Sequence, residues 1–92
     1  MFTMTLNELK TRLETEKHIT GGLQIAFGRK SNLPCIIGIY EENGYWYIYD
    51  TDDWGSICVL DHGSEEEMAE ALYRRVLKIE KRLLKKEKER KR

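Results

Sequence analysis

The sequence predicts a single α+β domain in the order helix, four strands, helix, with a four-stranded antiparallel meander sheet that carries both helices on one face. Three observations predict it. A chain of 92 residues is long enough for one hydrophobic core and too short for two. Apolar residues recur at the helical period near both ends of the chain and alternate at the strand period between them. Turn residues separate the strand-like runs.

The first helix is expected to begin at Thr5, which forms a capping box with Glu8. The helix is expected to end near Lys17, before two consecutive glycines. Three leucines fall within a narrow arc at 3.6 residues per turn and predict a buried stripe. They are Leu6, Leu9 and Leu13.

The strands follow from alternating apolar residues and from turn residues. Asn43 and Gly44 tolerate positive φ angles and predict a two-residue type I′ turn between the second and third strands. A second turn is expected from Asp52 to Ser56. The strands predicted in this way cover residues 23–27, 35–42, 45–51 and 57–60.

The second helix is expected to begin at Ser64, which forms a capping box with Glu67. Burial on its apolar face should stop near Leu83 or Leu84, so residues 1–84 are expected to form the domain. Residues 85–92 are then a basic helix extension or a disordered tail. The predicted apolar face consists of Met68, Ala69, Leu72, Val76, Ile79 and Leu83.

The two-residue turn fixes the register of the hairpin, so the side chains sort into two faces. One face carries Ile37, Ile39, Trp46 and Ile48. The other face carries four tyrosines. Two short helices cover only one face of such a sheet, and we expect them on the isoleucine and tryptophan side. The tyrosine face should therefore be largely open.

Tyrosines are enriched at recognition surfaces, and carboxylates beside them favour a basic protein partner. A purely structural interpretation also remains open, because cross-strand tyrosine pairs stabilise sheets by about 0.2 to 1 kcal/mol each. In the binding interpretation, the tyrosines are anchors and the acidic residues steer the partner. The predicted partner-binding residues are Tyr40, Glu41, Tyr45, Tyr47, Tyr49, Asp50, Asp52 and Asp53.

The charges are strongly separated along the chain. Residues 1–73 hold five basic and thirteen acidic residues, whereas residues 74–92 hold eleven basic and three acidic ones. The basic end suggests an alternative function, a small nucleic-acid-associated or regulatory protein acting through its terminal helix. Interleaved glutamates and the lack of aromatic residues in this segment weaken the case for nucleic-acid binding. A second apolar line on this helix, Tyr73, Leu77 and Leu84, suits a homodimer or packing against the first helix.

Catalytic and metal-binding motifs are missing from the sequence. Cys58 and His62 lie about 13 Å apart on an extended strand, too far for a nucleophile and its base. Cys35 and His18 complete the set of cysteines and histidines, and their spacing does not suit a metal site. We expect no enzyme activity, no cofactor and no metal. Membrane spans and a signal peptide are also missing, and two cysteines without a metal pattern suggest the cytoplasm.

Several short motifs resemble one family. They are a leucine-bearing helix start (residues 5–9), the strand sequence 44–50, a Trp54-Gly55 turn and the helix start at 64–69. Together they resemble the small α+β immunity proteins of bacterial polymorphic-toxin systems, of the immunity protein 59 type, over residues 4–80. The resemblance implies a non-enzymatic cytosolic antidote that binds and occludes a cognate toxin, such as a basic nuclease-like domain. The long basic end departs from the family pattern.

Overall fold

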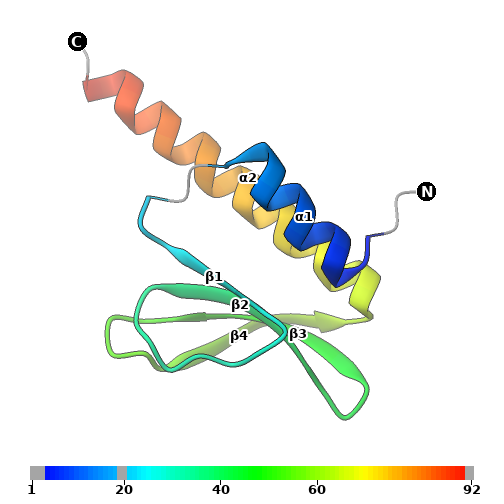
Figure 1. The fold of residues 1–92 in the computed structure, drawn as a ribbon. Helices are drawn as coiled ribbons and strands as arrows, with labels where there is room; N and C mark the ends of the chain where they lie inside the picture. The colour runs from blue at the N-terminus through cyan, green and yellow to red at the C-terminus, as the bar shows by residue number, and fades with distance from the viewer. Residues whose placement is uncertain (1–3, 19–20, 91–92) are drawn as a thin grey trace.

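The computed structural model describes residues 4–18 and 21–90. Figure 1 shows two helices side by side on one face of a four-stranded sheet. The predicted α+β class and the order of the elements are confirmed. In chain order the elements are α1 (Leu6–Glu16), β1 (Gln24–Phe27), β2 (Ile36–Glu42), β3 (Tyr45–Thr51), β4 (Ile57–Gly63) and α2 (Glu65–Arg90).

Both helices begin at the predicted capping boxes. Thr5 Oγ1 accepts a hydrogen bond from the Glu8 amide at 3.2 Å. Ser64 Oγ accepts one from the Glu67 amide, and Glu67 Oε1 accepts one from the Ser64 amide, both at 3.2 Å. These bonds satisfy amide groups that the first turn of a helix leaves without partners. Helix α1 ends where expected, because Lys17 adopts the left-handed conformation that stops it.

The predicted hairpin of β2 and β3 is confirmed in its register. Gly38 pairs with Tyr49, and Tyr40 pairs with Tyr47. Asn43 and Gly44 both have positive φ angles, as a type I′ turn requires. The Tyr49 ring lies over Gly38 so closely that a side chain at residue 38 would overlap it. A glycine opposite the tyrosine is therefore a packing requirement of this pair.

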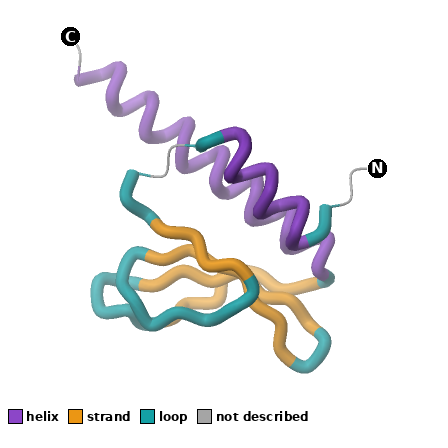
Figure 2. The backbone as a smooth tube through the Cα atoms, viewed as in Figure 1, coloured by secondary structure: helices purple, strands orange, loops and turns teal. Residues whose placement is uncertain are grey.

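The prediction of an all-antiparallel meander is wrong for the first strand, because β1 pairs with β2 in parallel. For β2 to pair in parallel with β1, the chain must first return to the end of the sheet at which β1 begins. Residues 28–35 make this return on the side of the sheet away from the helices (Figure 2). Their eight residues reach at most about 28 Å, which exceeds the roughly 13 Å length of β1. A short loop is therefore sufficient for the crossover.

The main core lies between the helices and the sheet. Its fully buried members include Leu9 from α1, Ile39 and Ile48 from the sheet, and Leu72 and Val76 from α2. Trp46 packs against this cluster and is partly buried. The isoleucine and tryptophan face is thus the one that both helices cover, as predicted. Burying such apolar side chains contributes about 25 cal/mol per Å² of apolar surface.

Helix α2 is much longer than α1 and extends past the sheet (Figure 1). Val76 is fully buried and Leu83 is partly buried, whereas Leu84 is exposed. Lys85 and Lys86 are also exposed. The helix continues to Arg90, and residues 91 and 92 of the predicted tail lie outside the described residues. The basic end of the chain therefore begins as a continuous helix.

Candidate functional site

The sheet face opposite the helices, called the far face below, is only partly open. Tyr45 is 59% exposed and Tyr47 is partly buried. Tyr40 is 6% exposed and Tyr49 is fully buried. The expectation of an open tyrosine face is therefore wrong for Tyr40 and Tyr49, which belong to a second small core with Ala26 and Ile36. Neither helix covers these two rings.

The loop 28–35 is what covers the far face. Tyr49 Oη donates a hydrogen bond to the Arg29 carbonyl at 2.8 Å. Thr51 Oγ1 donates one to the Leu33 carbonyl at 2.7 Å and accepts one from the Ile36 amide at 2.8 Å. Burial raises the pKa of Tyr49, so its hydroxyl remains a donor. Two side chains of β3 thus hold the loop against the sheet.

Stacked rings on the far face form a row across the strands, from β2 through β3 to β4. The ring of Tyr40 stacks on that of Tyr47, with centroids 5.2 Å apart. Tyr47 in turn stacks on His62 of β4, with centroids 6.1 Å apart. Tyr47 is therefore held by aromatic neighbours on both sides, and only part of its ring is available to a partner.

The predicted steering carboxylates do not form one group. Glu41 pairs with Trp46 and Asp50 pairs with Ile37, so both lie on the helix-covered face. Asp52 and Asp53 are exposed in the turn between β3 and β4. The site predicted from the sequence is therefore divided between the two faces of the sheet. Only the two turn aspartates flank an accessible aromatic residue, which is Trp54.

Trp54 lies in a turn whose backbone is tightly fixed. Asp52 Oδ1 accepts hydrogen bonds from the amides of Trp54 and Ser56, each at 2.9 Å. Gly55 has a φ of +80° and packs against loop 28–35, where a methyl group would overlap the Asn32 carbonyl. The indole is nevertheless 86% exposed. A large aromatic side chain thus extends into solvent from a rigid backbone.

Further exposed apolar side chains surround this turn. We call Leu33, Trp54, Ile57 and Val59 the edge patch; they are 56%, 86%, 41% and 48% exposed, respectively. Ile57 and Val59 pair with Thr51 and Tyr49 and so share the far face with them. Strand β4 is also the last strand of the sheet, so its outer edge lacks a strand partner among the described residues.

Sequence reasoning missed the edge patch, although part of its signal was present. Ile57 and Val59 are two residues apart on a predicted strand and therefore share a face. Trp54 within a turn of aspartates and glycine is also unusual for a residue type that is normally mostly buried. The contribution of Leu33 depends on the path of loop 28–35, which local patterns do not predict.

A cluster of polar side chains joins the two helices. His18 Nδ1 lies 2.9 Å from Glu80 Oε1, and His18 Nε2 lies 2.5 Å from Glu16 Oε1. Tyr73 Oη donates to the same Glu16 oxygen at 2.6 Å. The hydrogen bonds to Glu16 and Glu80 raise the pKa of His18 above its ordinary value. When it is protonated, the imidazole donates from both nitrogens and acts as a clamp between α1 and α2.

This clamp predicts a pH dependence of stability. Because the pKa of His18 is raised in the folded protein, its contribution is fully present below the ordinary pKa of 6.5 and is lost as pH rises through the raised value. We expect His18→Gln to lower the free energy of unfolding more at about pH 6 than at about pH 9. Urea denaturation of both proteins at the two pH values measures this. An equal difference at both pH values would show that the charge of His18 is not involved.

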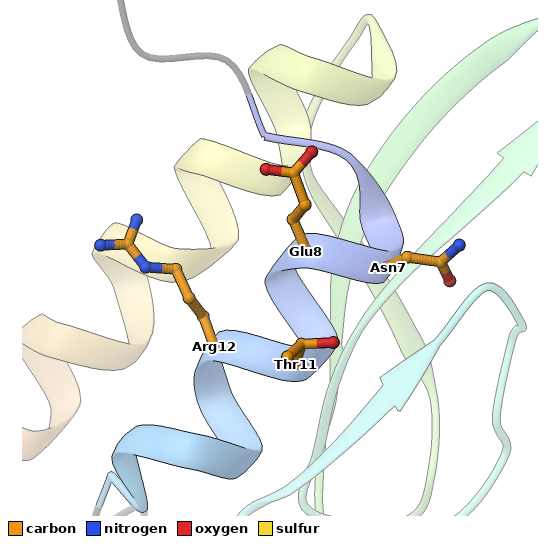
Figure 3. A pocket seen from close by; sticks show the side chains of 4 residues that line it. All are labelled: Asn7, Glu8, Thr11 and Arg12. Carbon is orange, nitrogen blue, oxygen red and sulfur yellow. The ribbon is translucent and has the colours of Figure 1, made fainter.

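A shallow surface hollow on α1 is chemically simple. Its volume is about 420 Å³, and the lining side chains that Figure 3 labels come from α1. The lining residues are Asn7, Glu8, Thr11 and Arg12. A single helix face of this kind does not bring groups from different elements together. We therefore do not assign a reaction to it.

Other kinds of site find no support in the described part of the chain. No group of three or more potential metal ligands occurs there. Cys35 and Cys58 are exposed free thiols. No helix among the described residues is long and apolar enough to cross a membrane.

Comparisons of this chain with protein-family models, with curated proteins and with solved structures gave no match. The resemblance to immunity proteins thus remains a prediction from the motifs of the sequence. Among the described residues, the edge patch combines exposed apolar side chains from loop 28–35, the turn 52–56 and β4.

Proposed function

We propose that this protein is a non-enzymatic, cytoplasmic binding module that neutralises a partner protein by docking it on the edge patch. The single observation that supports this most is Trp54, an indole that is 86% exposed on a turn fixed by Asp52 and by contact with loop 28–35. Tryptophan is strongly enriched among residues that dominate binding energy. A side chain held in place before binding also loses little conformational entropy when the partner docks.

The proposed partner is basic. Asp52 and Asp53 stand beside the indole and are exposed. Carboxylates around an apolar centre accelerate association with a cationic surface and repel polyanions. Of the residues first predicted, Asp52 and Asp53 lie next to the edge patch, whereas Tyr45 and Tyr47 lie farther along the far face, toward the β2–β3 turn. Tyr40 and Tyr49 instead support the far face from within the second core.

The exposed edge of β4 adds a second means of attachment. An edge strand offers unpaired amide and carbonyl groups, and a strand of a partner pairs with them through main-chain hydrogen bonds. The side chains of Ile57 and Val59 would lie on the far face beside those of the added strand. A toxin domain bound in this way, as the resemblance to immunity proteins suggests, is occluded by the edge patch and the edge of β4.

Amide hydrogen exchange tests this proposal. The protein is compared free and in complex with a toxin domain encoded beside it. We expect added protection in β4 and in the turn 52–56, because these segments would carry the contacts. Protection confined to α2, or no complex with any neighbouring toxin domain, would contradict the proposal.

The projecting end of α2 carries the second candidate function, nucleic-acid binding. It is favoured by the continuous helix to Arg90 and by the eleven basic residues among residues 74–92. Basic residues in a row bind phosphates with an affinity that falls steeply with salt. Truncation after Leu84 separates the two functions. It should abolish nucleic-acid binding, whereas toxin neutralisation through the edge patch should survive it.

A further inference from the structure

A second pocket lies on the opposite side of the sheet from the edge patch, where α2 diverges from the strands (Figure 1). Its volume is about 280 Å³, which approaches the size of small-ligand sites. Its apolar lining comes from several elements of the fold. These residues are Leu23, Ile37, Leu60 and Ile79. The divergence of the helix thus leaves apolar surface of the sheet accessible beside the main core.

The helix wall of this pocket is cationic. Arg75, Lys78 and Arg82 all line it. Their spacing of three and four residues places them on one face of α2, along about 10 Å of its axis. In the part of the chain that the structure describes, none of the three forms an ion pair. Three cationic residues without ion pairs therefore line the helix wall of this pocket.

The sheet wall carries a single opposing charge. Asp50 and Thr51 line the pocket from the end of β3. Asp50 is partly buried and also lacks an ion pair among the described residues. The pocket is thus polarised, with positive charge on the helix and a carboxylate on the sheet. Because three cationic residues and one anionic residue line the pocket, it favours a negatively charged ligand.

We infer that this pocket binds a small organic anion with a short apolar body, held with its acid group against α2 and its apolar part on the sheet. Guanidinium groups bind carboxylates and phosphates through paired hydrogen bonds. We therefore place the acid group of the ligand near Arg75 and Arg82. The apolar lining accounts for the rest of the ligand. None of the described residues that line the pocket is aromatic, so they do not offer a nucleic-acid base a stacking surface. This ligand site is independent of the proposed docking of a toxin.

Asp50 sets the orientation of the ligand. A carboxylate on the sheet wall repels a second acid group, so the ligand's charge is held at the helix. Asp50→Asn removes this repulsion with little change in shape. We therefore expect the variant to bind the same anion several-fold more tightly.

The probe is octanoate, titrated into the full-length protein while the methyl signals are followed by NMR at about 0.15 M salt, which screens distant charges. We expect saturable shifts of the methyl groups of Leu23, Ile37, Leu60 and Ile79. Arg82→Glu should weaken the affinity about tenfold or more, because a hydrogen bond to a charged group is lost and a repulsion is added. Circular dichroism verifies that each variant is folded.

Lys81→Glu is the matched control. It changes charge by the same amount at the adjacent position of α2, but Lys81 is exposed and does not line the pocket. Unchanged octanoate affinity in this variant supports the site. The inference is overturned if Lys81→Glu weakens binding as much as Arg82→Glu, if 1-octanol binds as tightly as octanoate, or if octanoate does not shift these methyl signals.

Discussion

Replacing Tyr49 with alanine is expected to lower the free energy of unfolding by about 3 to 5 kcal/mol, the range for removing a large buried aromatic side chain. The ring is fully buried between Gly38 and loop 28–35. Removing it leaves a cavity at a glycine, which has no side chain to fill the space. The hydrogen bond to the Arg29 carbonyl is lost as well. Urea denaturation measures the change.

Tyr45→Ala is the matched control, because Tyr45 lies on the same strand and the same face but is 59% exposed. We expect its change to stay within about 0.5 kcal/mol, as for exposed sites. Similar losses in both variants would mean that loop 28–35 does not cover Tyr49. The far face would then be open, as the sequence alone suggested.

Trp54→Ala is expected to have the largest effect on binding. Buried tryptophan anchors contribute about 2 to 4 kcal/mol, which corresponds to a loss of affinity of about 30-fold to 1,000-fold. Stability should change little, because the indole is almost entirely exposed and the backbone bonds of its turn do not involve the side chain. Loss of binding without loss of stability would identify Trp54 as a contact residue.

Much of the fold follows from local patterns in the sequence. The capping boxes at Thr5 and Ser64 mark the helix starts because the hydrogen bonds involved span only three residues. The Asn43-Gly44 turn is also local, because its two residues fix the register of β2 and β3. Trp46 and Ile48 then share the helix-covered face through simple alternation.

The parallel pairing of β1 was not predictable in this way. Whether β1 runs parallel or antiparallel to β2 depends on how loop 28–35 crosses the sheet, which is a non-local choice. The far face needs a cover, since Tyr40 and Tyr49 together with Ile36 are too apolar to remain exposed. The loop provides that cover, and local propensities do not reveal it.

The candidate site was partly predictable. Alternation alone places Asp50 on the face of Ile37 and Glu41 on that of Trp46, so their separation from the tyrosines was available from the sequence. Closeness along the chain was a misleading guide to closeness in space. The gathering of Leu33 with Trp54 depends instead on the crossover and on Gly55 packing against Asn32.

Calorimetric titration of a toxin domain encoded beside this protein into wild type, Trp54→Ala and Leu84→Ala tests the proposed docking surface most directly. Leu84 is also an exposed apolar residue, but it lies on α2. We predict that the dissociation constant rises by at least about 30-fold for Trp54→Ala and stays within about twofold of wild type for Leu84→Ala. Equal affinities of wild type and a folded Trp54→Ala variant would contradict the account.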